Sequence, residues 1–143
     1  MRKLTTVGIA LMLALTLAVP TTLATDEGIE SKLRSVVEKN FSVAEEEDLE
    51  KYMDTAHPQS PTYQQTRKLA KRMMDRYDLE YELLLFNYIG EDGKYQLARV
   101  KQKTTNTSEA AFRDNIIVNI WAFRKHEGKW KNWNTMLLER EFL

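Results

Sequence analysis

The stretch LEYELLLFNYIGEDGKYQLARVKQKT, residues 79–104, decides the fold of this 143-residue chain. Both of its ends are rich in aromatic and branched aliphatic residues, which is typical of β-strands. Between them, the segment GEDG at residues 90–93 contains an Asp-Gly pair, which is a strong short-range signal for a β-hairpin. We therefore predict two antiparallel strands, over residues 79–89 and 94–104.

Two more strands are predicted further along the chain. The segment FRDNIIVNIWAFR, residues 112–124, alternates with a period of two and places Ile116 and Val118 on the same face. A turn at residues 126–128 leads to the last predicted strand, over residues 130–139. Both faces of these strands carry apolar side chains, which suits a curved sheet whose concave side is partly core and partly cavity wall.

The first half of the chain predicts helices. A helix over residues 28–40 is indicated by an apolar stripe at helical spacing, made of Ile29, Leu33, Val36 and Val37. We expect Ser42-Val43 to interrupt it, and a second helix to run over residues 44–55 with four acidic residues, 45–48, in its first turn. Ser60 as N-cap and Pro61 after it predict a third helix, over residues 62–77. Helices followed by such strands predict an α+β domain in which a curved, mostly antiparallel four-stranded sheet forms a cone.

The N-terminus has the pattern of a secretory signal peptide. Two basic residues precede an apolar run over residues 7–19, and Thr22-Leu23-Ala24 is a plausible cleavage site. The run is shorter than the roughly 20 residues that a membrane-spanning helix needs. We predict a signal peptide at residues 1–24, a single domain at residues 25–143, and a secreted or periplasmic protein with no stable membrane anchor after cleavage.

Composition excludes several classes of function. Lys and Arg number 21 and Asp and Glu also number 21, so the chain has no basic excess for nucleic-acid binding. It has no cysteine, which rules out disulfides, cysteine nucleophiles and thiolate metal sites. The two histidines lie far apart, and no phosphate-binding glycine loop is present. We expect no nucleic-acid partner, no metal and no cofactor.

Several segments resemble a known family. They include YMDTAHPQSP (residues 52–61), RYDLEYELL (76–84), YIGEDG (88–93) and FRDNIIVNIWAFRKHEGKWKNWN (112–134). Together they look like the nuclear transport factor 2-like (NTF2-like) superfamily, and in particular its SnoaL-like bacterial branch. The turn EGKWK at residues 127–131 is the most recognisable piece. The resemblance covers roughly residues 28–140.

The resemblance implies a sheet wrapped around a long helix, a conical pocket, and a homodimer formed through the sheet. Enzymes of this superfamily use an Asp or His base with Tyr or Trp donors inside the cone. The residues of these types that could form a catalytic site are Asp114, His57, Tyr52, Tyr63 and Tyr81. Residues that could line the pocket are Phe86, Ile116, Val118, Trp121 and Trp133.

Each of the two bases has a structural alternative. His57 could be a general base near the mouth of the cone, or a loop histidine that caps a helix end before Pro58. Asp114 could be a desolvated base, or the exposed start of a strand. The sequence contains no strong catalytic constellation. We therefore expect a non-catalytic module that binds a small apolar ligand or a protein partner, with a small-molecule isomerase or dehydratase as the alternative.

Overall fold

The computed structural model describes residues 23–143 as three helices followed by four strands. The helices are α1 (Leu23–Glu45), α2 (Leu49–Asp54) and α3 (Tyr63–Arg76). The strands are β1 (Leu79–Asp92), β2 (Tyr95–Asn106), β3 (Asn115–His126) and β4 (Lys129–Phe142), and all neighbours in the order β1-β2-β3-β4 are antiparallel. This confirms the predicted fold class, helices followed by a curved four-stranded sheet.

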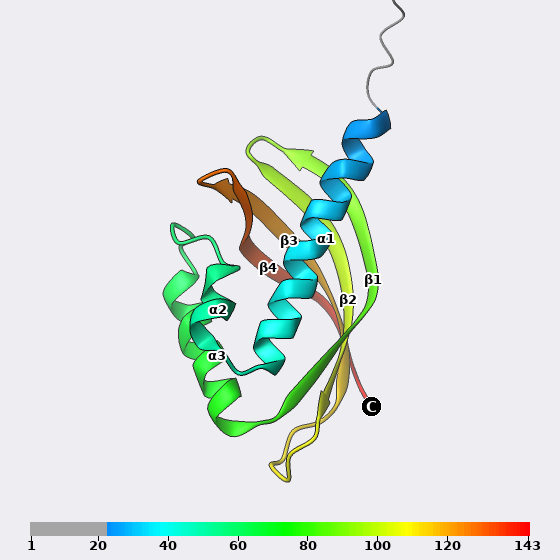
Figure 1. The fold of residues 1–143 in the computed structure, drawn as a ribbon. Helices are drawn as coiled ribbons and strands as arrows, with labels where there is room; N and C mark the ends of the chain where they lie inside the picture. The colour runs from blue at the N-terminus through cyan, green and yellow to red at the C-terminus, as the bar shows by residue number, and fades with distance from the viewer. Residues whose placement is uncertain (1–22) are drawn as a thin grey trace, which may run out of the picture.

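The curved sheet has α1 on its concave side, with α2 and α3 beside that helix (Figure 1). The apolar stripe of α1 forms the core with the inward residues of the strands: Leu33, Val37, Phe41, Phe86, Ala98, Val100, Trp121 and Phe123 are all buried. The open end of the cone lies between the sheet and the α2–α3 pair.

The sheet bends because β1 and β4 carry irregularities. In β1 the pairing register shifts between Leu83 and Leu85 and again between Tyr88 and Gly90. In β4 it shifts opposite Val118/Asn119 and opposite Ala122/Phe123. Bulges of this kind increase local twist and turn a strand around a core. They curl the sheet without closing it into a barrel.

The helix boundaries differ from the predicted ones around residues 42–48. Helix α1 continues through Ser42-Val43 to Glu45, because Val43 and the residue after it are buried and keep the helix packed. Of the four acidic residues, Glu45 ends α1, and Glu46 and Glu47 form the turn after it instead of the first turn of the second helix. The fourth, Asp48, is the N-cap of α2, and its side chain accepts a hydrogen bond from Lys51 N at 3.0 Å.

The start of α3 also differs, because Ser60 is not its N-cap. The N-cap is Thr62, and Ser60 Oγ instead donates to the carbonyl of Trp133 in β4 at 2.6 Å. Next to it, His57 N donates to Asn132 O at 2.7 Å, and Asn132 N donates to Thr55 O at 2.8 Å. The α2–α3 linker is thus fastened to β4.

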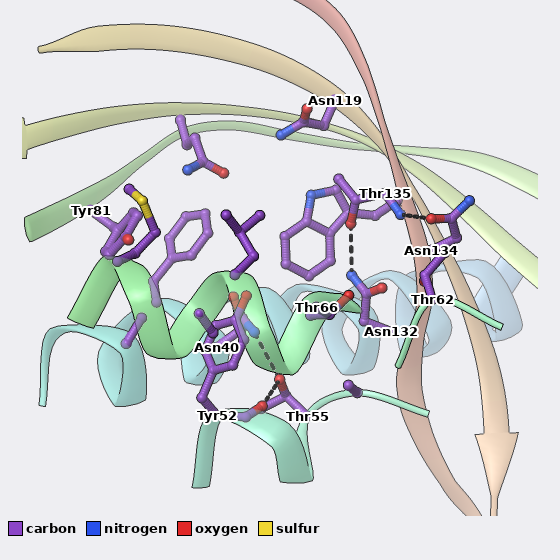
Figure 2. A pocket seen from close by; sticks show the side chains of 18 of the residues that line it. Asn40, Tyr52, Thr55, Thr62, Thr66, Tyr81, Asn119, Asn132, Asn134 and Thr135 are labelled. Carbon is purple, nitrogen blue, oxygen red and sulfur yellow. Dashed lines mark hydrogen bonds between the residues drawn. The ribbon is translucent and has the colours of Figure 1, made fainter. Parts of the chain in front are cut away.

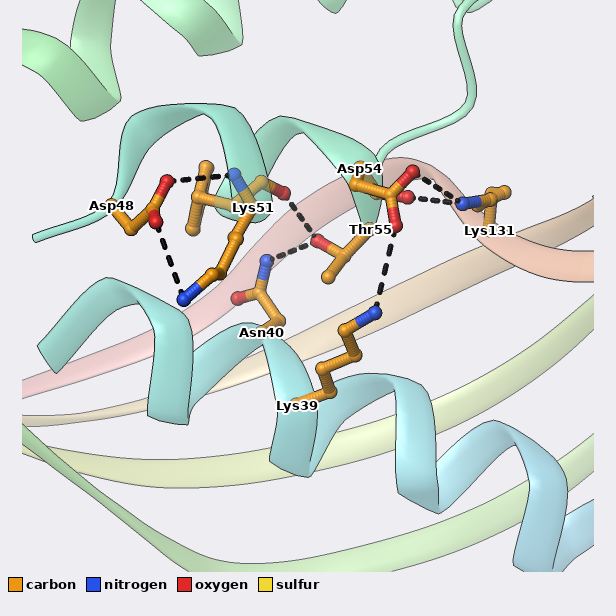
Figure 3. Close-up of polar contacts among 8 residues, drawn as sticks. Lys39, Asn40, Asp48, Lys51, Asp54, Thr55 and Lys131 are labelled. Carbon is orange, nitrogen blue, oxygen red and sulfur yellow. Dashed lines mark hydrogen bonds and ion pairs between the residues drawn. The ribbon is translucent and has the colours of Figure 1, made fainter. Parts of the chain in front are cut away.

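Ion pairs add a second connection between α2 and the sheet. Lys131 Nζ of β4 donates to the backbone carbonyl of Asp54 and lies 3.2 Å from its carboxylate, which Lys39 of α1 also approaches at 3.5 Å (Figure 3). Lys131 foremost, and then Lys39, hold the pKa of Asp54 below its usual value. The Asp54 side chain is largely exposed, so these pairs orient α2 more than they stabilise the fold.

The predicted signal peptide falls on residues 1–24, and residues 1–22 lie outside the described part of the chain. Within residues 23–143, none of the helices has the length and apolar character required to cross a membrane.

Candidate functional site: a pocket at the open end of the cone

A pocket of about 540 Å³ lies between the C-terminal part of α1, the α2–α3 pair and the inner faces of β3 and β4 (Figure 2). Its volume is in the range of small-molecule sites. Helix α3 contributes the apolar side chains Leu69, Ala70, Met73 and Met74. The sheet contributes Ile117, Asn119 and Trp121 from β3 and residues 132–135, Leu137 and Arg140 from β4.

Neutral polar side chains make up much of the remaining lining. Amides and hydroxyls converge there from every surrounding element: Asn40, Thr55, Ser60, Thr62, Gln65, Thr66, Gln102, Asn119, Asn132, Asn134 and Thr135. Some are paired with each other, since Asn40 Nδ2 donates to Thr55 Oγ1 at 2.8 Å and Asn132 Nδ2 donates to Thr135 Oγ1 at 3.1 Å (Figure 2). Thr55 in turn donates to Tyr52 O at 2.7 Å. Among the described residues that line the pocket, only Glu47 and Arg140 are charged, and both are exposed.

Two buried residues on the inner face of β3 carry polar groups that have no hydrogen-bond partner among the described residues. Trp121 is 5% exposed, and its indole Nε1 has no hydrogen-bond partner among the described residues. Asn119, two residues earlier on the same face, is 4% exposed, and we find no partner for its amide within residues 23–143. A buried donor without an acceptor is rare in proteins, because it loses its hydration and gains nothing in return.

The pocket tyrosines are hydrogen-bond donors. Burial raises the pKa of Tyr52, and hydrogen bonding with Asn40 offsets part of that rise. Burial, with smaller contributions from Tyr52 and Glu45, raises the pKa of Tyr81 to about 12. Both phenols therefore stay protonated near neutral pH, so they can donate a hydrogen bond but cannot act as bases.

The structure places His57 outside the pocket, behind one of its walls. The ring is 1% exposed and packs against Trp133, with ring centroids 4.9 Å apart. Its Nδ1 accepts a hydrogen bond from Gln59 N at 3.2 Å, so Nε2 carries the proton and donates to Lys125 O, also at 3.2 Å. Both ring nitrogens are thus occupied by backbone groups, and burial lowers the pKa of the ring.

Asp114 also lies outside the pocket, in the connection between β2 and β3. Its Oδ1 accepts a hydrogen bond from Asn106 N at 2.9 Å, and its backbone carbonyl accepts one from Leu143 N at 2.9 Å. These bonds close the β2–β3 loop and fix the C-terminus. The structure does not bring Asp114 within the lining that contains the tyrosines.

The other predicted residues divide between three places. Lining the pocket are Tyr52, Tyr63, Tyr81, Trp121 and Trp133. Phe86 lies instead in the core beneath α1, because the first bulge of β1 turns it to the concave face. Ile116 and Val118 pair with Glu141 and Glu139 on the face opposite Asn119 and Trp121, so they lie on the convex side.

The amides that define the pocket were not predicted from the sequence. In β3, Asn119 and Trp121 alternate with apolar residues. A neutral amide at a position that points inward was the one sequence signal that could have indicated the polar part of the pocket. The amides of β4 and of α1 come from distant segments, and only the folded chain brings them together. Among residues 23–143 there is no group of three or more His, Asp or Glu side chains placed to hold a metal ion.

The fold places the chain in a known structural class. A candidate scytalone dehydratase from Novosphingobium aromaticivorans superposes with a TM-score of 0.69 at 9% identity, covering 84% of this chain and 91% of that chain. A Mycobacterium tuberculosis protein of unknown function gives 0.68 at 12% identity, covering 84% and 77%. A candidate dehydratase of the NTF2-like family from Streptomyces avermitilis gives 0.61 at 12% identity, covering 80% and 99%.

These similarities show that the chain has the NTF2-like fold. The assignment to the SnoaL-like branch stays a prediction. The particular family comes from the sequence, since the family model for the C-terminal domain of the anti-sigma-I factor RsgI9 matches residues 35–143. The chain belongs to this family of domains. No curated protein matches the chain.

Proposed function

We propose that this domain binds an uncharged small molecule in the open end of its cone and does not transform it. The observation that carries the proposal is the contrast between a roomy pocket and the absence of a base within its described lining. The lining is made of aromatic, aliphatic, amide and hydroxyl groups, and the two charged residues at its edge are exposed.

Proton-transfer chemistry of the isomerase or dehydratase type needs a base near the reacting carbon. His57 and Asp114 are occupied by backbone hydrogen bonds outside the pocket, and the pKa values of Tyr52 and Tyr81 are raised. For an isomerase or dehydratase, the only carboxylate left in the described lining that could act as the base is that of Glu47, an exposed residue in the turn after α1. A ligand-binding domain also suits a family named after a regulator, an anti-sigma factor.

The test is a comparison of two variants of α3. Ala70→Phe puts a ring into the pocket, whereas Gln64→Phe adds the same ring to an exposed position of the same helix. We expect an environment-sensitive fluorescent dye of small apolar type to bind the wild type and Gln64→Phe, and to bind Ala70→Phe at least about tenfold more weakly. Equal binding to all three proteins, or none to the wild type, would contradict the proposal.

A second measurement addresses catalysis. Protein purified from its native host under non-denaturing conditions is analysed by mass spectrometry, and any retained molecule is released, identified and incubated with fresh protein. We expect the molecule to be recovered unchanged. Its conversion, with loss of conversion in Glu47→Gln, would support the isomerase or dehydratase alternative instead.

A protein-interaction function has its own observation. On the convex face of the sheet, Met136 of β4 is 57% exposed beside the half-buried Ile120 of β3, and Leu85 of β1 is 46% exposed opposite Lys101 of β2. A homodimer through this face would cover them. Light scattering checks this, with Met136→Lys expected to shift the protein from dimer to monomer.

A further inference from the structure

We propose that His57 makes one wall of the pocket an acid-sensitive latch, which is closed while its imidazole is neutral and opens when the imidazole takes up a proton. The latch consists of residues 55–60, in the α2–α3 linker, and residues 131–133 of β4. Both sides line the pocket, the linker with Thr55, Ala56 and Ser60 and the strand with Asn132 and Trp133. The inference goes beyond the proposed function, because it concerns how this wall opens and is tested on the ligand-free protein.

The latch can open without unfolding the sheet. Its backbone contacts are those of a single parallel bridge, in which His57 N donates to Asn132 O at 2.7 Å and Asn132 N donates to Thr55 O at 2.8 Å. One side-chain bond follows, from Ser60 Oγ to Trp133 O at 2.6 Å. The four strands, in contrast, pair with one another along their length. A segment held by so few bonds opens locally at a lower free energy than the whole domain.

The hydrogen bonds of the ring require a neutral imidazole. Nδ1 of His57 accepts from Gln59 N, and Nε2 donates to Lys125 O, both at 3.2 Å. The ring thereby connects the linker to β3. The Lys125 ammonium itself lies over the Trp130 ring, 5.2 Å from its centroid. An imidazolium has two N–H donors and no acceptor. A proton from the solvent on Nδ1 would therefore face the N–H of Gln59, and the ring could not keep both of its partners.

The surroundings of the ring also oppose a positive charge. The His57 side chain is 1% exposed, and its ring packs on that of Trp133. Burial first, and then the titratable His126 and the positive Arg124 and Lys131, lower the pKa of His57. A protonated ring is therefore more stable in water than in the closed latch.

The neighbouring carboxylates are paired with other groups. Asp54, at the end of α2, lies 3.2 Å from Lys131 Nζ and 3.5 Å from Lys39 Nζ. Glu127, in the β3–β4 turn, lies 3.9 Å from Nε2 of His126. Within residues 23–143, the groups found to act on the ring include no carboxylate that would hold it in place once it is protonated. Protonation therefore favours the open latch.

The test is amide hydrogen exchange of the ligand-free chain, followed by ¹⁵N NMR at pH 7.5 and 5.5. The amide protons of His57 and Asn132 report on the latch, since both donate across it, and that of Val100, in the core strand β2, reports on unfolding of the domain. An exposed imidazole with the usual pKa of about 6.5 favours the open latch about tenfold more at pH 5.5 than at pH 7.5. We expect the protection factors of the two latch amides, corrected for the intrinsic effect of pH, to fall by up to about tenfold and to stay below that of Val100.

Two histidine variants make the matched comparison. His57→Asn keeps an oxygen acceptor in the linker but has no titratable group, whereas His126→Asn removes the neighbouring histidine, whose ring centroid is 5.2 Å away. We expect His126→Asn to keep the wild-type loss of protection at pH 5.5, and His57→Asn to lose less than about twofold. If His57→Asn does not fold, long-range ¹H–¹⁵N spectra of the wild type follow the ring itself, which should stay in the Nε2–H form for as long as the latch amides are protected.

Three outcomes would overturn the inference. Protection of the latch amides that does not change with pH, or that falls equally in His57→Asn, would show that the ring does not control the wall. Latch amides as protected as Val100 would show that the wall opens only when the domain unfolds. Protonation of the ring while the latch amides stay protected would show that the closed wall accepts the charge. Because no dye or ligand is present, each of these results leaves the proposed function standing, and a failure of dye binding leaves the latch standing.

Discussion

The two ends of the concave face are built on the same strands but have opposite contents. Under α1, the side chains that point inward from the sheet are apolar and form the buried core, and Phe123, Ala98 and Val100 are all 0% exposed. A few residues further along, the inward positions are Asn119 and Gln102, which are as buried but face a pocket. The comparison teaches that one end of the face holds the fold together, while the other end is available for a ligand.

The end of the concave face that lines the pocket lowers the stability of the domain. The indole Nε1 of Trp121 is buried there without a hydrogen-bond partner among the described residues, which is unfavourable, and polar side chains line space that aliphatic side chains would fill with a gain in stability. Neither disulfides nor a metal cluster in residues 23–143 compensates. Proteins commonly accept such local loss of stability at binding sites.

The largest effect is expected at the packed end. Phe123→Ala removes a fully buried ring and should lower the free energy of unfolding by about 3–5 kcal/mol. Phe142→Ala, which truncates the same side chain at 49% exposure, should cost less than about 1 kcal/mol. Urea unfolding followed by circular dichroism measures both. If Phe123→Ala does not fold, Phe123→Leu gives the milder version, and equal costs at the two positions would contradict the comparison.

An intermediate effect is expected at His57, which joins the two ends by fastening the α2–α3 linker to the sheet. His57→Ala removes two hydrogen bonds and a buried ring and should cost about 2–4 kcal/mol. His126→Ala, the half-buried neighbour with a ring centroid 5.2 Å away, is the control and should cost less.

The same residue predicts a pH dependence. Burial, with smaller effects of His126, Arg124 and Lys131, lowers the folded-state pKa of His57 below the usual value of about 6.5. In the unfolded chain the ring is protonated as the pH falls through 6.5, while the folded state resists protonation, so stability falls below that pH. Unfolding at pH 7.5 and 5.5 should show a smaller pH-dependent loss in His57→Ala than in the wild type. An equal loss in both proteins would assign the pH dependence to other groups.

The sequence predicted the order of elements and the curved sheet, because strand alternation and hairpin turns are local signals. The β3–β4 turn is an example: Glu127 and Gly128 have φ angles of 50° and 77°, as a two-residue turn between paired His126 and Lys129 requires. The unbroken end of α1 was not predicted, because the packing of Val43 against distant residues overrides the local polarity of Ser42.

Faces and sites were harder to predict than elements. A strict period of two would place Leu85 on the same face as Leu83, but the bulge in β1 reverses the alternation, so Leu85 is 46% exposed while Phe86 is buried. Ionisable side chains are the residues whose chemistry can be recognised in a sequence. Asp114 and His57 are such residues, yet the side chains of both form hydrogen bonds with backbone groups outside the pocket. The amides of the pocket have no such signature, because they come from distant segments that only the folded chain brings together.

The smallest effect is expected at the open end, where two equally buried asparagines should behave differently. Asn40 is 8% exposed and donates to Thr55 Oγ1 at 2.8 Å, so Asn40→Leu breaks a buried pair and should cost about 1–3 kcal/mol. Asn119 has no partner among the described residues, so Asn119→Leu removes an amide that contributes nothing to the unliganded fold. We expect its unfolding free energy to stay within about 1 kcal/mol of the wild type, or to rise, while ligand binding is lost. Chemical unfolding of the ligand-free proteins compares the two variants directly. A large loss at Asn119 would mean that its amide is part of the structural core, and that the boundary between the packed end and the open end lies further along the sheet.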